Sequence, residues 1–282
     1  MRNFLALITT AALVSFSGCA SKSVAADATN APMEKEVSAY LVGAQTDVAT
    51  AKGALETAGF TVISEYKIKK IGTSIVFTSD ALTAAASKEG RGHAAILRLL
   101  VDDANKQVSI TNPVYFGKAF LQDDFDYATA SAALAAINKA FPGLKMSDDK
   151  WEFDGLSSYH FMMGMPYYED PMDLGEGDNA ALIAKAKSYK KGKFLVFEYK
   201  LSDTATLLGY ELGRKTSKFV KKTGTNKAQI LPYTILIENG KATALAPKFY
   251  IAVSYPLLSM GEFMTIATVP GAIEKDLKKP FK

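Results

Sequence analysis

The chain has 282 residues, of which 48% are hydrophobic, so it is long enough for two small globular domains or one larger one. Its 33 basic and 29 acidic residues leave a formal net charge of +4, which is too small to indicate a nucleic-acid-binding protein. Cys19 is the only cysteine, and this excludes an internal disulfide.

The first residues have the pattern of an export signal. Arg2 provides a positive charge, residues 4–16 form a short apolar segment, and small residues precede Cys19. Residues 16–19 (Phe-Ser-Gly-Cys) resemble the lipobox of bacterial lipoproteins, in which the cysteine is acylated and becomes the mature N-terminus. The alternative is an ordinary signal peptide with an incidental cysteine.

We therefore predict a lipoprotein signal peptide over residues 1–18 and a small, polar, Ala-rich tether over residues 19–36. Ala20 after the cysteine resembles the pattern of lipoproteins that are sent to the outer membrane. No later apolar run is long enough for a transmembrane helix. We expect a membrane-anchored protein of the bacterial cell envelope, attached through a lipid on Cys19 and facing the periplasm.

Residues 37–145 have the pattern of an α+β unit. Alternating apolar residues predict strands, and Ala-rich segments that begin at capping residues and end at glycine predict helices. The predicted strands are 39–42, 60–68, 94–101 and 107–111, and the predicted helices are 47–58, 80–87 and 127–140.

A polar connection, predicted over residues 146–158, leads to a second unit over residues 159–282. Asn239-Gly240 predicts a tight hairpin turn in this unit, because both residues accept positive φ at little cost. The predicted strands are 159–164, 193–201 and 228–237, and the predicted helices are 178–188 and 213–222.

The two units repeat each other at a spacing of 134 residues. Residues 96–116 align without a gap with residues 230–250, and Gly90 aligns with Gly224. At the start of the units, residues 38–42 are matched with residues 158–162 at a shorter spacing. The repeat predicts an α+β fold of two tandem pseudo-symmetric units packed together, each an antiparallel sheet covered by helices.

The second unit resembles the domain-of-unknown-function 302 family. The resemblance rests on a Leu-Gly segment at 207–212, a helix, an Ile-Leu-Pro-Tyr segment at 230–233 and a hairpin that leads to Ala246-Pro247. It implies a small α+β unit that can pair, and no established activity.

Residues 160–165 (His-Phe-Met-Met-Gly-Met) combine soft ligands of the kind that bind Cu(I) or haem iron. In a strand, His160 and Met162 point to the same side, so these two are the candidate metal ligands. Together with Tyr167 and Tyr168 they are also candidate ligand-binding residues at the junction of the units, where pockets form preferentially. The alternative is a Met-rich core strand.

A basic segment follows in the second unit, and its counterpart in the first unit is nearly uncharged. Such an asymmetry predicts a face for anionic phospholipid headgroups, lipopolysaccharide or an acidic protein partner, although a solvated helix face has the same pattern. The basic residues are Arg214, Lys215, Lys218, Lys221 and Lys222.

These observations favour a lipid-anchored envelope protein that binds a partner or acts as a scaffold through the junction of its two units, with no nucleic acid as a partner. A soft-metal or haem-binding protein is one alternative. An envelope hydrolase that uses His93 or His160 is another, but no nucleophile pairs with either histidine by motif. We therefore assign no catalytic residue, leave the cofactor open, and favour a binding protein over an enzyme.

Overall fold

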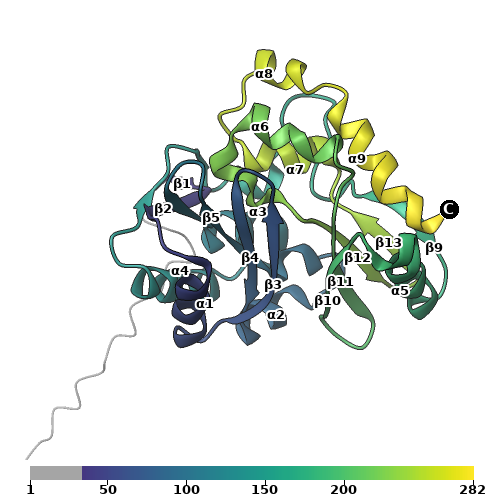
Figure 1. Cartoon of the computed structure of the whole chain (residues 1–282), viewed down its shortest axis with the longest axis horizontal. Helices are drawn as coiled ribbons and strands as arrows, with labels where there is room; N and C mark the ends of the chain where they lie inside the picture. The colour runs from purple at the N-terminus through teal and green to yellow at the C-terminus, as the bar shows by residue number, and fades with distance from the viewer. Residues whose placement is uncertain (1–33) are drawn as a thin grey trace, which may run out of the picture.

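The computed structural model of the chain describes residues 34–282, so the predicted signal peptide and Cys19 lie outside the described residues. The fold is α+β, as predicted, and is built on two antiparallel sheets that lie beside each other (Figure 1). No helix in residues 34–282 is long and apolar enough to cross a bilayer.

The first sheet is covered on one face by two helices and packs with its other face toward the second unit. Its strands are β2 (Tyr40–Ala44), β3 (Thr61–Ile68), β4 (Gly72–Thr78), β5 (Leu97–Asp102), β6 (Gln107–Thr111) and β7 (Lys145–Met146), in the order β3-β4-β5-β6-β2-β7. The helices of this unit are α1 (Val48–Thr57), α2 (Asp80–Ala86), α3 (Pro113–Leu121) and α4 (Tyr127–Ala140). Of these, α1 and α4 form the main cover, because their side chains Leu55 and Ile137 are buried against the sheet, and Leu82 of α2 belongs to the same cluster.

The second sheet has five strands. They are β9 (Met172–Glu176), β10 (Leu195–Lys200), β11 (Ala205–Tyr210), β12 (Tyr233–Glu238) and β13 (Lys241–Ala244), in the order β10-β11-β12-β13-β9. The helices of this unit are α5 (Asn179–Ser188), α6 (Val220–Thr223), α7 (Pro247–Ser254), α8 (Met260–Thr265) and α9 (Val269–Lys278). Strands β1 (Glu36–Ser38) and β8 (Lys150–Glu152) form a separate two-stranded ribbon.

The two sheets have equivalent strand orders. When β2 to β6 are matched in chain order with β9 to β13, each strand has the equivalent neighbours in its own sheet. This agrees with the predicted duplication, while a pseudo-symmetric placement of the two sheets stays a prediction.

The strand predicted at the start of the second unit is wrong. Residues 159–164 form a loop and not a strand, and the first strand of the second sheet is β9. The amide of Met165 donates a hydrogen bond to the carbonyl oxygen of Met162 at 2.9 Å, and Gly164 has a positive φ of 80°, so the chain turns here instead of continuing as a regular strand. The predicted connection 146–158 carries β8, and its first residue belongs to β7.

The predicted helix 213–222 is also different in the structure. It consists of a 3₁₀ turn (Thr216–Phe219) followed by the single turn α6. Gly213 and Thr216 are held by hydrogen bonds to Asp276 on α9, so this segment follows the surface of α9 instead of forming one regular helix.

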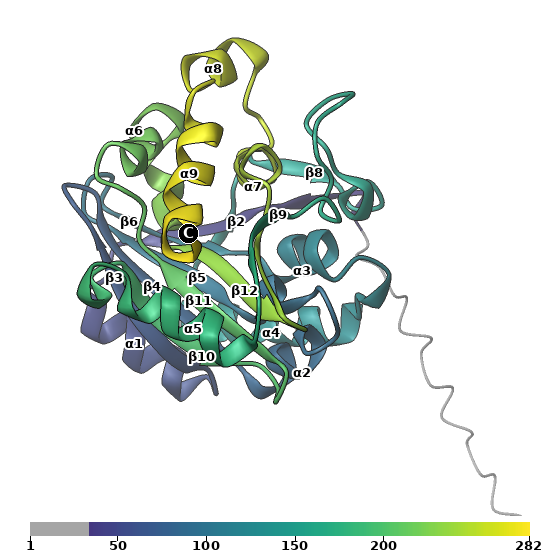
Figure 2. The same cartoon turned by 90° about the vertical axis from the view of Figure 1, so that its right-hand side faces the viewer.

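One hydrophobic core crosses the boundary between the units. At this boundary the phenol of Tyr40 donates a hydrogen bond to the carbonyl oxygen of Ser254 at 2.8 Å, and that of Tyr115 donates to Val253 at 2.9 Å. Both tyrosines are fully buried. Helices α3 and α7, which carry Tyr115 and Val253, lie near each other in both views (Figures 1 and 2).

Candidate functional site

A groove with a volume of about 490 Å³ lies between the two units. The first unit contributes the β3–β4 hairpin, and the second contributes the segment from Glu211 to Lys221 together with Leu231. In Figure 1 the tip of this hairpin reaches α6. A groove of this size suits a small-molecule ligand.

The rim of the groove is strongly basic. Glu211 is the only acidic residue among those that line it, and none of its cationic side chains forms an ion pair within the described part of the chain. The six cationic residues, all exposed, are Lys67, Lys69, Lys70, Arg214, Lys218 and Lys221. Charge of one sign in a concave surface raises the local concentration of ligands with the opposite charge.

The hairpin end that carries three of these lysines has a fixed geometry. Lys70 lies in the turn with a φ of 63°, a left-handed conformation that places it at the bend. A β-carbon at Gly72 would collide with the carbonyl oxygen of Val101, so only glycine allows this close pairing of β4 with β5. The amide of Ala104 donates to the carbonyl oxygen of Ile71 at 3.0 Å and anchors the turn.

On the opposite wall, Asp276 holds the basic segment in place. Its Oδ2 accepts hydrogen bonds from the amide of Gly213 at 2.9 Å and from the hydroxyl of Thr216 at 2.6 Å, and its Oδ1 pairs with Lys279 at 2.7 Å. Partial burial opposes ionisation, but these hydrogen bonds outweigh it and lower the pKa of the Asp276 carboxyl. The carboxylate therefore fixes the chain beside Arg214.

The floor of the groove is apolar and buried. It contains Ile68, Ile71, Val220 and Leu231, which belong to the core that the two units share. Burial raises the pKa of the half-buried Glu211 carboxyl, and Lys193 partly opposes this effect. The groove thus offers cations around an apolar base, a combination that suits an anionic ligand with an apolar part.

The structure brings three of the predicted basic residues, Arg214, Lys218 and Lys221, to the groove, while Lys215 and Lys222 lie outside its lining. Sequence reasoning missed the hairpin lysines. Their signal in the sequence is the short basic run 67–70 (Lys-Ile-Lys-Lys).

The four residues predicted to bind a ligand at the junction do not form one site. Met162 and Tyr167 are 44% and 45% exposed on the surface loop, and His160 packs its ring against Tyr167 with 4.5 Å between ring centroids. Because residues 159–164 are not a strand, the geometry that paired His160 with Met162 as metal ligands is absent. In residues 34–282 no three His, Cys, Asp or Glu side chains are grouped to hold a metal ion.

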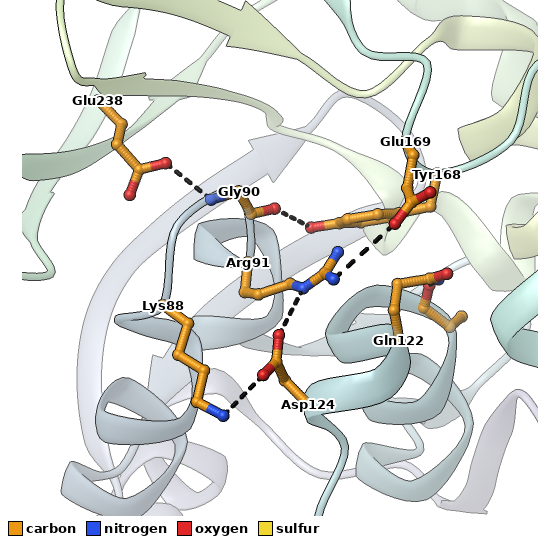
Figure 3. Close-up of polar contacts among 9 residues, drawn as sticks. Lys88, Gly90, Arg91, Gln122, Asp124, Tyr168, Glu169 and Glu238 are labelled. Atoms are coloured by element: carbon orange, nitrogen blue, oxygen red, sulfur yellow. Dashed lines mark hydrogen bonds and ion pairs between the residues drawn. The ribbon is translucent and has the colours of Figure 1, made fainter.

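Tyr168 has a structural role at the junction, which Figure 3 shows. Its buried phenol donates a hydrogen bond to the carbonyl oxygen of Gly90 at 2.7 Å, and the Arg91 guanidinium lies over its ring. Arg91 pairs with Asp124 at 3.0 Å, and Lys88 pairs with the same carboxylate at 2.6 Å. Hydrogen bonds from these two cations lower the pKa of Asp124.

His93 is buried in the same junction. Its Nδ1 lies 2.9 Å from the hydroxyl oxygen of Thr234 in the second unit. Burial, assisted by the positive charge of Arg98, lowers the pKa of His93 to about 3. A neutral, enclosed imidazole is not placed to act as a base on an external substrate.

Comparisons with protein-family models, with curated proteins and with solved structures found no match to this chain. The resemblance of the second unit to the domain-of-unknown-function 302 family therefore stays a prediction.

Proposed function

We propose that this chain is a lipid-anchored cell-envelope protein that binds an anionic ligand in the groove between its two units. The observation that carries the proposal is the basic rim, in which six unpaired cations from two units converge on one concave surface. Binding at the junction also agrees with the general position of ligand pockets at domain interfaces.

The ligand class that suits this surface is a molecule with several negative charges, such as a phosphorylated lipid headgroup or sugar. Three lysines on the hairpin and Arg214, Lys218 and Lys221 of the second unit line the same groove, so more than one phosphate or carboxylate can be held at once. The buried apolar floor between them favours a ligand that also has an apolar part.

Membrane attachment completes the proposal. A lipid on Cys19 would keep the groove close to the anionic molecules of the envelope. We expect the anchoring membrane to be the outer membrane, with the protein on its periplasmic side. The anchor is tested by growing cells with a labelled fatty acid. The protein should incorporate the label, and a Cys19→Ser variant should not.

The two alternatives have weaker support. The soft-metal or haem-binding hypothesis needed a strand at His160, and the chain forms a loop there. The hydrolase hypothesis needed an accessible histidine base beside a nucleophile. His93 is enclosed and hydrogen-bonded to Thr234, while His160 in the surface loop packs against Tyr167 and its Nδ1 lies 3.3 Å from the carbonyl oxygen of Ser158.

Calorimetric titration with inositol hexakisphosphate, used as a polyanionic probe, tests the groove. The double variant Lys69→Gln with Lys70→Gln should bind the probe about tenfold more weakly, because each lysine near an anionic group adds a favourable electrostatic contribution. Binding should also weaken as salt is added.

Lys190 and Lys191 provide a matched control. They are also adjacent exposed lysines, and like Lys70 they have a positive φ, at 49° and 60°, but they do not line the groove. Replacing both by Gln removes the same charge elsewhere and should change the affinity less than about twofold. Equal losses in the two double variants would show that the probe responds to net charge alone and would contradict the proposal.

A further inference from the structure

Exposed apolar side chains gather at one end of the molecule. Eight large hydrophobic side chains are exposed in residues 34–282, and six of them lie in only two segments, 159–167 and 255–265. Their exposed fractions run from 40% for Met260 to 94% for Met163. The six are Met162, Met163, Tyr167, Leu257, Met260 and Met264. Scattered apolar residues need no explanation, but such a concentration marks an interaction surface.

The two segments form one structure. Phe161 packs against Phe263 with 5.1 Å between ring centroids, and Phe263 is buried. Ser259 and Glu262 cap the start of α8 reciprocally, which stabilises this short helix. Met260 and Met264 are one turn apart on it and so face the same side.

The apolar tip is defined here as Met162, Met163, Leu257, Met260 and Met264. Its helix α8 stands at the outer end of the molecule in both views (Figures 1 and 2). The tip is a projection and not a groove, so it suits insertion into a soft medium better than reception of another chain. Methionine side chains are unbranched and flexible and adapt well to such a medium.

Basic residues adjoin the tip. The ammonium group of Lys222 donates a hydrogen bond to the carbonyl oxygen of Thr265 at the end of α8, at 3.0 Å. Lys221 and Lys222 both lie on α6, are exposed and form no ion pair in the described part of the chain. Apolar side chains flanked by lysines that are not neutralised by a carboxylate are typical of surfaces that bind anionic membranes.

We propose that the apolar tip inserts into the interfacial region of an anionic lipid bilayer while Lys221 and Lys222 lie at the level of the headgroup phosphates. The inference goes beyond the proposed groove ligand, because it needs nothing bound in the groove. In the envelope it would orient the protein on the membrane that carries its lipid anchor.

The test uses the full chain with Cys19→Ser, which leaves no native thiol. Met163→Cys then provides a single attachment point for a polarity-sensitive fluorophore. Mixing with phosphatidylglycerol vesicles should shift its emission to the blue, as expected for a dye that enters an apolar medium, and phosphatidylcholine vesicles should give a much smaller shift. The same fluorophore on Lys139→Cys, an exposed position on α4, should show no shift.

A second variant tests the side chains. Met163→Asp with Met264→Asp should weaken co-sedimentation with phosphatidylglycerol vesicles at least about tenfold, because insertion would then carry two negative charges toward the acyl chains. Both positions are exposed, so circular dichroism should show an unchanged fold. All variants share the same N-terminal segment, so binding through that segment cannot produce a difference between them.

Three results would overturn the proposal: no blue shift at position 163, equal shifts at 163 and 139, or a concentration-dependent dimer that the double aspartate variant abolishes. The last result would assign the tip to a second copy of the chain. The groove is tested separately, because the tip variant should keep its affinity for inositol hexakisphosphate. If the groove variant loses its affinity for inositol hexakisphosphate but the tip still inserts into vesicles, the groove is confirmed and the tip proposal stands as well.

Discussion

His93 ties the two units together at a point where they approach closely. A β-carbon at the preceding Gly92 would lie 2.5 Å from the Leu236 side chain, so a larger residue here would have to displace that buried leucine. The imidazole then reaches Thr234 in the second sheet. Since the ring is enclosed and Arg98 is nearby, protonation of His93 opposes the folded state.

This predicts a loss of stability in mild acid. The pKa of His93 is about 3 in the folded chain and near 6.5 when unfolded, so the unfolded chain binds the extra proton as the pH falls below 6.5. The stabilisation that depends on neutral His93 is therefore fully present above about pH 6.5, and it declines as the pH falls toward 3. By pH 5 the loss should be about 2 kcal/mol of the free energy of unfolding.

Denaturant titrations at pH 7 and pH 5 measure this loss. His93→Gln retains a polar side chain but has no group that titrates here, so its free energy of unfolding should change less between the two pH values than that of the unmodified chain. His160→Gln is the control, because His160 lies in a surface loop. If His93→Gln kept the full pH dependence, the imidazole would not be its source.

At the scale of elements, the basic wall of the groove depends on α9. Asp276 on α9 accepts hydrogen bonds from Gly213 and Thr216, and no other acidic side chain of the described residues bonds to this segment. Asp276→Ala should reduce the free energy of unfolding by about 1–3 kcal/mol, because it leaves the donors of this segment without their charged acceptor.

The same variant should also weaken binding of inositol hexakisphosphate, although Asp276 does not line the groove. Removing an acid should by itself favour a polyanion, so weaker binding would show that the position of Arg214 and Lys218 matters. Glu274→Ala is the control, since Glu274 lies on the same helix and, within residues 34–282, forms its ion pair with Lys278 alone, at 2.6 Å. Tighter binding by both variants would indicate that Asp276 acts only through its charge.

The elements that were predicted correctly from the sequence are those with strong local patterns. The helix 127–140 has the bounds of α4, and its cap Asp126 accepts hydrogen bonds from the backbone as the pattern of helix starts requires. The predicted strand 159–164 was wrong, because alternating apolar residues also occur in a loop that packs Phe161 inward. Adding the 134-residue spacing to residues 38–42 gives residues 172–176, and these form β9.

Only one of the two basic segments that line the groove could be predicted from the sequence. The basic segment 214–222 stood out because its counterpart in the first unit is nearly uncharged. Lys67, Lys69 and Lys70 are more than 140 residues away in the chain, and only the packing of β3 beside β10 and of β4 beside the 3₁₀ segment Thr225–Ile230 brings them to the same surface. Local sequence patterns do not contain that tertiary contact.

For the whole molecule, the shared core makes the two units one folding unit. Side chains of both sheets belong to a single hydrophobic cluster, and buried hydrogen bonds from Tyr40 and Tyr115 cross the boundary. Separating the units would expose this core and leave the carbonyl groups of Val253 and Ser254 without these partners, and such a state is unfavourable.

We therefore expect a single cooperative unfolding transition. The fluorescence of Trp151, the only tryptophan, should give the same midpoint as far-UV circular dichroism. Tyr115→Phe should lower the free energy of unfolding by about 1–2 kcal/mol, because it removes one buried hydrogen bond across the boundary, and should move both midpoints by the same amount. Tyr167→Phe, an exposed tyrosine in the surface loop, should move neither. Two separate transitions, with only one sensitive to Tyr115→Phe, would show that the units unfold independently despite their common core.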